Sequence, residues 1–330
     1  MKDRTLMKAV QLTGIEGLRS LTLTQVERPT PGPDEVLFRV KAAGVNFAEL
    51  EMIYGRYPSP RPLPAIMGFE AAGEVIEVGA NVENVSPGDR VTAIVSSGGY
   101  AEYAVAPAAN IIPIPEGVSF AEASTITVQG LSAYAILKLA AQPQPHETIL
   151  VQAAAGGVGL YLVQLAKIMG AKRVIALASS GEKLELVKSL GADVAVNYAE
   201  TGWTDEIVEA TGGAGVDILL ESISGKIADE CFRLVAPFGR VVMYGAKNAN
   251  DILPAEKVAQ LIHKNQTVIG FNIPSLLPEQ IAECVPGLLQ LIASGRLKLF
   301  ARNEFRLEEV ATAFEALASR NTIGKVVLIP

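Results

Sequence analysis

The stretch TILVQAAAGGVG, residues 148–159, decides the fold of this chain. An apolar, β-prone run leads into glycines, and the glycines open a helical pattern over 160–169. A strand, a glycine turn and a helix N-terminus place free backbone N–H groups where a pyrophosphate binds. A second apolar run, 173–178, completes a βαβ unit of the expected length. Because the pattern departs from the common G-x-G-x-x-G, a tight turn in another doubly wound protein is the alternative.

The end of the second apolar run indicates which dinucleotide binds. An NAD-binding unit carries Asp or Glu about 20 residues past the glycines, where the carboxylate bonds the ribose 2′-hydroxyl. Here the run ends in Ala178-Ser179-Ser180-Gly181, and Lys183 follows in the next helical pattern. A carboxylate would repel a 2′-phosphate, whereas hydroxyls and an ammonium bind it. The sequence therefore favours NADPH over NADH; the alternative is that Lys183 is only an exposed helix residue.

The composition is consistent with a soluble enzyme and excludes several other classes of protein. Hydrophobic residues make up 49% and charged residues 19% of the chain, which supports sizeable cores and excludes a disordered protein. A net charge of -7 argues against nucleic acid as a main partner. The two cysteines, Cys231 and Cys284, cannot form a multi-cysteine metal site. Without a signal-peptide core or an apolar run near the roughly 20 residues that span a bilayer, we expect a cytoplasmic protein with no membrane partner.

The pattern of expected secondary structure changes along the chain, and the change predicts two domains. Up to about residue 124, short β-prone segments alternate with turn signals, which is typical of a partly closed antiparallel barrel. Strand and helix patterns then alternate as in a doubly wound parallel sheet. The last expected elements are a helix at 279–294, a strand at 297–302, a helix at 307–319 and a strand at 325–329. We predict an α/β protein with a barrel domain at 1–124, an inserted nucleotide-binding domain at 125–270, a return to the barrel domain at 271–330, and a cleft between the domains.

In order and spacing, these segments resemble the medium-chain dehydrogenase/reductase superfamily, and within it the zinc-independent quinone oxidoreductase (ζ-crystallin-like) branch. The matching motifs are Ala43–Phe47, Gly55–Pro58, Gly68–Gly73, Pro87–Val91, Gly99–Tyr103, Gln129–Tyr134, Ala154–Gly159 and Ser319–Lys325. The resemblance covers nearly the whole chain. It implies a GroES-like catalytic domain with an inserted Rossmann-type domain, and a homodimer.

Two positions indicate the branch. Where the zinc-dependent alcohol dehydrogenases carry a cysteine and a histidine as zinc ligands, this chain has Asn46 and Phe69. Zinc binds N and S ligands in a nearly tetrahedral cage, and no ligand pairs with His146 or His263 in the sequence. We therefore expect no metal and an acceptor that is already electrophilic, because no Lewis acid polarises it. Quinones and α,β-unsaturated carbonyls meet this requirement.

Two residues are expected to act in catalysis. By resemblance, Asn46 bonds the nicotinamide-side ribose or the substrate oxygen near the hydride, and capping of local backbone is its alternative. Tyr57 occupies the family's Gly-x-Tyr position, and its phenol can donate a hydrogen bond to a developing oxyanion. Packing over the quinone without proton chemistry is the alternative for Tyr57.

The other candidates are expected to hold NADPH. The glycine turn presents N–H groups to the pyrophosphate, and Ser179 and Lys183 contact the 2′-phosphate. By resemblance, Thr127 lies near the nicotinamide and the segment 271–273 meets its carboxamide. Tyr198 and Arg320 are expected near the phosphates. The alternatives are that Tyr198 is a strand-end aromatic residue and that Arg320 is a solvated charge. The predicted set is Asn46, Thr127, Gly130, Ala155, Gly156, Gly157, Val158, Gly159, Ser179, Lys183, Tyr198, Gly245, Phe271, Ile273 and Arg320.

Three functions stay open on the sequence alone. The leading one is NADPH-dependent reduction of quinones, and the second is reduction of an enone, an alkenal or an enoyl thioester. The third is non-enzymatic, as a crystallin-like or RNA-binding protein that keeps the fold. The intact glycine turn, Asn46 and Tyr57 favour an enzyme. Phe69 and Glu51 stand where relatives carry other residues, and both can reshape the acceptor pocket.

Overall fold

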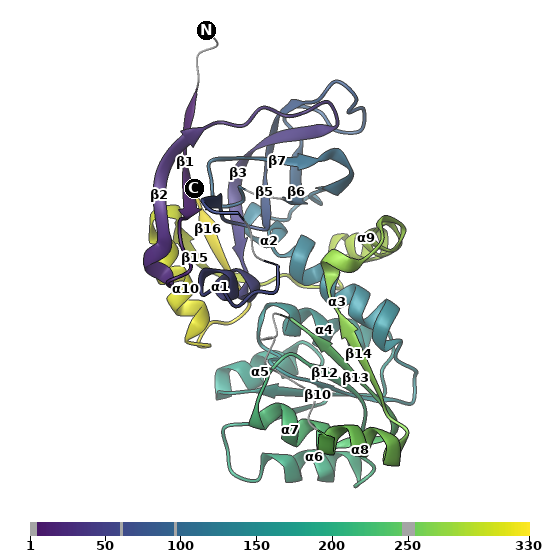
Figure 1. Ribbon diagram of the computed structural model, residues 1–330. Helices are drawn as coiled ribbons and strands as arrows, with labels where there is room; N and C mark the ends of the chain where they lie inside the picture. Colours follow the sequence, from purple (N-terminus) through teal and green to yellow (C-terminus); the bar gives the residue numbers. More distant parts are fainter. Residues whose placement is uncertain (1–4, 60–61, 96–97, 246–254) are drawn as a thin grey trace. The chain divides into compact units, whose positions relative to one another are not determined.

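The structure, a computed structural model, describes residues 5–59, 62–95, 98–245 and 255–330. The chain forms two compact units, whose elements are labelled in Figure 1. The first unit combines Met1–Val128 with Leu299–Pro330, and the second is Gln129–Lys298. One unit thus contains both ends of the chain, and the other is an insertion.

The first unit is built on two mostly antiparallel sheets. The smaller one has the order β2 (Leu21–Glu27), β1 (Leu6–Leu12) and β4 (Ala65–Ile66). The larger one has the order β15 (Ala301–Arg306), β16 (Lys325–Ile329), β3 (Glu35–Val45), β5 (Glu70–Val78), β6 (Arg90–Ile94) and β8 (Ile111–Pro113), and β7 (Tyr103–Pro107) also pairs with β3. The helices are α1 (Phe47–Ile53), α2 (Phe120–Ala123) and α10 (Val310–Ala318), with short 3-10 turns at Leu18–Ser20, Ala108–Asn110 and Leu307–Glu309. Among the strands that the structure describes in the larger sheet, β15 and β8 are the two terminal strands of the order and are not paired with each other, as in an open barrel.

The core of the first unit is mostly aliphatic and includes three buried aromatic side chains. Phe38 of β3, Tyr100 and Phe314 of α10 are fully buried, and the rings of Tyr100 and Phe314 meet edge to face with centroids 6.2 Å apart. The long strand β3 pairs with β5, β7 and β16. Since β3 leads directly into α1, the packed centre of the sheet fixes the position of that helix.

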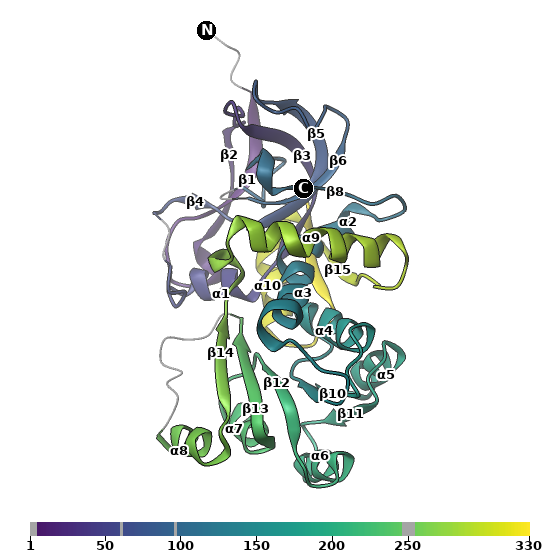
Figure 2. The same cartoon turned by 90° about the vertical axis from the view of Figure 1, so that its right-hand side faces the viewer.

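The second unit is a six-stranded parallel sheet with helices on both faces (Figure 2). The strand order is β11 (Val194–Asn197), β10 (Arg173–Ala178), β9 (Thr148–Val151), β12 (Val216–Glu221), β13 (Val235–Tyr244) and β14 (Thr267–Phe271). The helical segments are Ile126–Gly130, which begins in the first unit, α3 (Leu131–Ala135), Ile136–Ala141, α4 (Gly157–Ile168), α5 (Gly181–Ser189), α6 (Trp203–Thr211), α7 (Lys226–Arg233), α8 (Ala255–Lys264), the 3-10 turn Ile273–Ser275 and α9 (Pro278–Ala293). From β9, successive strands are added on one side up to β11, and from β12 they are added on the other side up to β14. Open α/β sheets bind ligands at such a switch point, here between β9 and β12.

The predicted fold class is confirmed, and two expectations near the C-terminus are corrected. The segment 271–298 lies in the second unit rather than returning at 271, because α9 packs on α3: a Cβ added at Gly287 would meet the hydroxyl of Tyr134. The strand expected at 297–302 begins instead at Ala301. Residues 297 and 298 are bonded within the second unit, Leu297 N–H to Leu291 O at 3.0 Å and Lys298 N–H to Gln164 Oε1 at 2.9 Å.

Candidate active site

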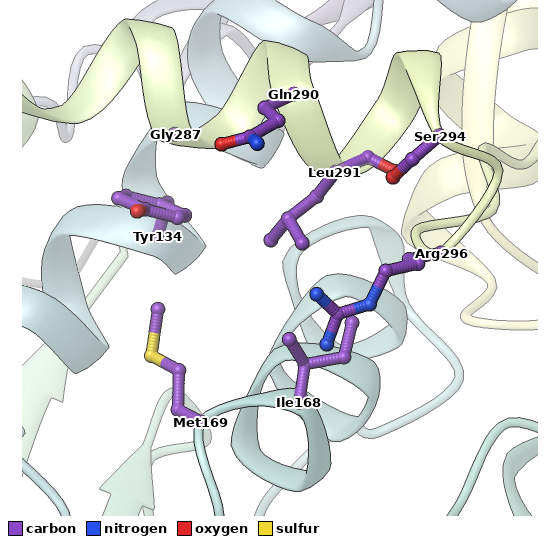
Figure 3. Close-up of a pocket in the computed structure, with 8 residues that line it drawn as sticks. All are labelled: Tyr134, Ile168, Met169, Gly287, Gln290, Leu291, Ser294 and Arg296. Carbon is purple, nitrogen blue, oxygen red and sulfur yellow. The ribbon is translucent and has the colours of Figure 1, made fainter.

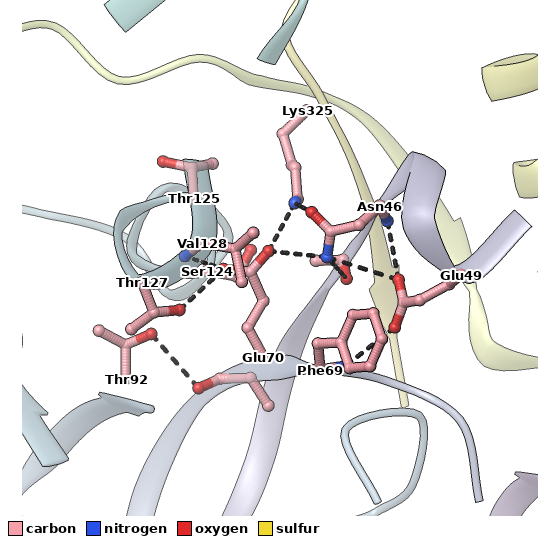
Figure 4. A network of polar contacts seen from close by, with 12 residues as sticks. Asn46, Glu49, Phe69, Glu70, Thr92, Ser124, Thr125, Thr127, Val128 and Lys325 are labelled. Atoms are coloured by element: carbon pink, nitrogen blue, oxygen red, sulfur yellow. Dashed lines mark hydrogen bonds and ion pairs between the residues drawn. The ribbon is translucent and has the colours of Figure 1, made fainter. Parts of the chain in front are cut away.

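A buried polar network gathers at the start of α1 in the first unit (Figure 4). Asn46 is the N-cap residue of α1, Glu49 lies in its first turn, and Glu70 and Lys325 open β5 and β16. Glu49, Glu70 and Lys325 are completely buried, and Asn46 is 7% exposed. Charged groups in such a place must be paired and hydrogen-bonded to be tolerated.

Glu70 and Lys325 form the ion pair at the centre of this network. Lys325 Nζ donates to Glu70 Oε1 at 2.5 Å and to Asn46 Oδ1 at 2.6 Å. The other oxygen, Glu70 Oε2, accepts from the Thr127 hydroxyl at 2.7 Å and from the Val128 N–H at 2.8 Å. Gly44 is required beside them, since a Cβ there would meet both Lys325 and Glu70.

Glu49 is the second carboxyl group of the network, and it is bonded by donors from three segments. Its Oε2 accepts from the Asn46 N–H at 2.8 Å and from the Tyr100 hydroxyl at 2.6 Å, and its Oε1 accepts from the Phe69 N–H at 2.8 Å. Burial nevertheless raises the pKa of Glu49 to about 7. Burial and the neighbouring Glu49 also raise the pKa of Tyr100. Glu49 can therefore gain or lose a proton near neutral pH.

The predicted residues Asn46 and Thr127 both have protein partners. The Asn46 carboxamide accepts from Lys325 and donates to Glu70 Oε1 at 3.1 Å and to Gly44 O at 3.3 Å. The Thr127 hydroxyl is bonded to Glu70. These bonds give both residues a positioning role in the network, and their contact with cofactor stays a prediction.

Tyr57 follows α1, and its side chain is partly buried. Its ring packs against that of Phe69, with centroids 6.3 Å apart and planes inclined by 46°. The third aromatic nearby is Tyr54, which lies under the guanidinium of Arg56. Aromatic surfaces of this kind suit a planar acceptor.

The glycine turn of the second unit connects β9 to α4. Gly156 is the N-cap residue of α4 in an extended conformation, so Gly157, Val158 and Gly159 form the first helical turn. A Cβ at Gly159 would meet the backbone of Ala153 and Ala154, and one at Gly157 would meet the carboxamide of Gln129. The Oε1 atom of Gln129 is buried without a hydrogen-bond partner. These glycines thus let the turn pack closely against Gln129, Ala153 and Ala154. The first N–H groups of α4, which have no partner within the helix, are those that a pyrophosphate site requires.

The predicted 2′-phosphate residues lie at the next strand ends. Ser179 follows β10 and Tyr198 follows β11, and the last residues of these strands, Ala178 and Asn197, are paired in register. Ser180 is the N-cap residue of α5. Lys183, in the first turn of α5, is only 9% exposed, and burial lowers its pKa. An anion bound beside this ammonium would offset the cost of that burial.

The remaining candidates are divided between the units. Phe271 ends β14 and pairs with Tyr244, the last residue of β13. Gly245 follows Tyr244 and has a φ of 89°. Ile273 opens a 3-10 turn just beyond them. Gly130 lies against Tyr161 and Leu288 inside the second unit. Arg320 belongs to the first unit, follows α10 and has a φ of 58°. Ala155, in the turn before α4, is buried.

A separate pocket of about 350 Å³ lies among α3, α4 and α9 (Figure 3). Its lining includes Tyr134, Met169 and Arg296. It adjoins the C-terminal end of α4, a helix of 12 residues whose N-terminus carries the glycine turn. At 1.5 Å per residue the two ends are about 17 Å apart, so this pocket is not the pyrophosphate site.

Comparison with known proteins identifies the family. Residues 32–116 match the alcohol dehydrogenase GroES-like domain, and residues 157–294 match the zinc-binding dehydrogenase family. The chain is 32% identical to the quinone oxidoreductase of Pseudomonas aeruginosa, over 98% of this chain and 99% of that protein. The chain belongs to the quinone oxidoreductase-like branch of the medium-chain dehydrogenase/reductase superfamily.

Further relatives are similar over nearly the whole of this chain. The synaptic vesicle membrane protein VAT-1 homolog of Homo sapiens is 32% identical, over 98% of this chain and 87% of that protein. The Escherichia coli quinone oxidoreductase, solved in complex with NADPH, superposes with a TM-score of 0.89 at 28% identity and covers 98% of this chain and 100% of its own. Among the helices that the structure describes, none has the length and apolarity to cross a membrane.

At the two positions where zinc-dependent alcohol dehydrogenases carry ligands, the residues of this chain do not suit a zinc ion. Asn46 and Phe69 supply neither the thiolate nor the imidazole that zinc prefers. In the described part of the chain, no three His, Cys, Asp or Glu residues are grouped as metal ligands. At the start of α1, the buried cation is the Lys325 ammonium.

Sequence reasoning missed the charged part of the network. The Asn-x-x-Glu spacing from Asn46 to Glu49 at a helix start is a recognisable capping signal. A lysine at the head of the apolar run Val326–Ile329 is a second signal, because an isolated charge in a buried strand needs a partner. No spacing could have shown that the partner is Glu70.

Proposed function

We propose that this oxidoreductase-family member reduces quinones with NADPH, by hydride transfer that needs no metal ion. The observation that carries the proposal is the residue pair Asn46 and Phe69 at the positions of zinc ligands, in a chain that retains the glycine turn at the start of α4. An acceptor in this site must be electrophilic without help from a Lewis acid. Quinones meet that condition because the anion formed on reduction is delocalised.

The cofactor is NADPH, and the second unit has the groups that would hold it. The N–H groups of the Gly156–Gly159 turn would bind the pyrophosphate, and Ser179 with Lys183 would bind the 2′-phosphate. We also assign Tyr198, Gly245, Phe271 and Ile273 of this unit to the cofactor, and from the first unit Arg320. When bound, NADPH supplies the hydride.

The first unit would orient the reaction and handle the proton. The ammonium of Lys325 and the carboxylate of Glu70 hold both ends of the Asn46 carboxamide. They would orient that side chain for its role in hydride transfer. Tyr57 would donate a hydrogen bond to the oxygen of the acceptor as negative charge develops there. The final proton comes from Tyr57 or from water.

A homodimer in the cytoplasm is the proposed state of the protein. Among the described residues, β14 is the last strand at one edge of the parallel sheet, and a second copy could pair with it there. Sedimentation at several protein concentrations tests this part, and a monomer at all of them would contradict it.

The decisive experiment measures NADPH oxidation against a panel of quinones, alkenals and enoyl thioesters, before and after treatment with a chelator. We expect the highest kcat/KM with quinones and no loss of rate with the chelator. If kcat/KM were higher with an enone or an enoyl thioester, that class of compound, and not quinones, would be the acceptor. No oxidation with any acceptor would favour the non-enzymatic role.

A further inference from the structure

Helix α1 ends in a turn that is closed by two backbone hydrogen bonds. The Gly55 N–H donates to Met52 O at 3.0 Å, and the Arg56 N–H donates to Glu51 O at 2.8 Å. Gly55 has a φ of 66°, the left-handed conformation that this Schellman ending requires. The ending places residue 56 directly beside residue 51.

The side chains of the same two residues form a second link. Arg56 Nε donates to Glu51 Oε2 at 2.8 Å, and Arg56 Nη2 donates to Glu51 Oε1 at 2.7 Å. The Glu51 side chain is 9% exposed and that of Arg56 is 45% exposed. The Arg56 guanidinium also lies 4.7 Å from the centre of the Tyr54 ring. A bidentate pair of this kind is among the strongest ion pairs in proteins. The hydrogen bond to Glu51 also raises the pKa of Arg56.

The ion pair lies next to the residues that would meet the acceptor. Tyr57 follows Arg56 directly, and its ring packs on Phe69. Glu51 is on the same helix as Glu49, and Asn46 caps that helix. Because Arg56 and Tyr57 are consecutive, a charge left unpaired on Arg56 would lie one residue away from the tyrosine that would meet the acceptor.

We propose that the Glu51–Arg56 pair selects uncharged acceptors, by neutralising the arginine beside Tyr57 and holding the turn from which Tyr57 projects. This inference rests on the proposed function, since it concerns the acceptor of that reaction. The Glu51 carboxylate accepts two hydrogen bonds from the Arg56 guanidinium. Without Glu51, the same donors could bind a carboxylate, sulfonate or phosphate on the acceptor. The paired site attracts neither anions nor cations.

The test compares two acceptors that differ by one charge, naphthoquinone and naphthoquinone sulfonate. The measured quantity is the ratio of their kcat/KM values in wild type, Glu51→Gln, Arg56→Gln and the double variant. We expect wild type to prefer the neutral quinone. Glu51→Gln frees the guanidinium and should shift the ratio toward the sulfonate by about tenfold, the size of one charge-assisted contact. The double variant removes both charges and should return the ratio to within about twofold of wild type.

A matched control and a readout without turnover separate the possible failures. Glu308→Gln removes a carboxylate from the exposed Lys8–Glu308 pair in the same unit and should leave the ratio unchanged. An unchanged ratio in Glu51→Gln, in an enzyme that reduces quinones, would overturn the inference and leave the proposed function standing. If wild type reduces neither quinone, the proposed function fails and acceptor selection fails with it. In that case Tm still tests the ion pair itself. If the change in Tm of the double variant equals the sum of the changes in the two single variants, Glu51 and Arg56 are not coupled, and the structural part of the inference is overturned as well.

Discussion

The Lys325 ammonium and the Glu70 carboxylate lie 2.5 Å apart, fully buried, although 255 positions separate them in the sequence. Each is the first residue of its strand, β16 or β5, and β3 lies between those strands in the sheet. The last strand of the chain is therefore tied by charge as well as by backbone pairing. Such a pair contributes little net stability against an apolar replacement, but loss of one partner leaves an uncompensated buried charge.

Lys325→Met should destabilise the protein by about 3–5 kcal/mol, because Glu70 then keeps its charge without a counter-ion. The double variant Lys325→Met with Glu70→Gln should recover much of that loss, since no buried charge is left. Urea unfolding of the three proteins measures both effects. Lys8→Met, at the exposed pair with Glu308, is the control and should change nothing measurable. Additive losses in the double variant would contradict the coupling.

The pH dependence of stability should show the titration of Glu49. Burial raises its pKa to about 7 in the folded protein from the ordinary 4.5. Between these values the folded state holds a proton that the unfolded state has released, so this contribution to stability is complete below 4.5 and is lost as pH rises through 7. Relative to Glu49→Gln, wild type should lose on the order of 3 kcal/mol of unfolding free energy over that range. Parallel pH profiles of the two proteins would show that the carboxyl titrates normally.

The sequence predicted the parallel sheet well because each of its strands is a short apolar run bounded by glycines and polar turns. The glycine turn was visible for the same reason: strand, turn and helix are contiguous in the chain. The polar network was largely hidden, because Glu49, Glu70, Tyr100 and Lys325 come from four separate segments. The end of the second unit was misplaced, because Lys298 is held there by a side chain, Gln164, and a hydropathy pattern carries no signal for such a bond.

Cofactor preference should depend on Lys183. NADPH should bind at least about tenfold tighter than NADH, equivalent to about 1.4 kcal/mol, through contacts to the 2′-phosphate. Lys183→Glu should abolish the preference, because a carboxylate repels that phosphate. Lys188→Glu makes the same change of charge on an exposed position of the same helix and should keep the preference. Titration of cofactor fluorescence gives the dissociation constants, and equal values for both cofactors in wild type would refute the assignment.

Two glycines of the turn should respond differently to a methyl group. Gly159→Ala drives a Cβ into the backbone of Ala153 and Ala154, so it should cost about 1–3 kcal/mol or more of stability. Gly157→Ala meets only the flexible carboxamide of Gln129, so stability should hold while NADPH binds more weakly. Gly181→Ala meets nothing within 4 Å and serves as the control for helix propensity. Urea unfolding and NADPH titration separate the two effects, and an equal loss of stability at both positions would contradict this reading of the turn.

Removal of the Tyr57 hydroxyl should lower turnover more than binding. A donor that is fully engaged with a developing oxyanion contributes about 2.7–4 kcal/mol. The anion formed from a quinone is stabilised by its own ring and can be protonated by water, so Tyr57→Phe should lose less than that with quinones and approach it with enones. The Phe variant keeps the aromatic surface that packs on Phe69, so a loss would report the hydroxyl itself. Asn46→Ala should impair both acceptors, because it removes the carboxamide that Lys325 and Glu70 hold in place. Pre-steady-state rates of NADPH oxidation give the comparison, and an unchanged rate for Tyr57→Phe with every acceptor would make the tyrosine a packing residue and water the proton donor.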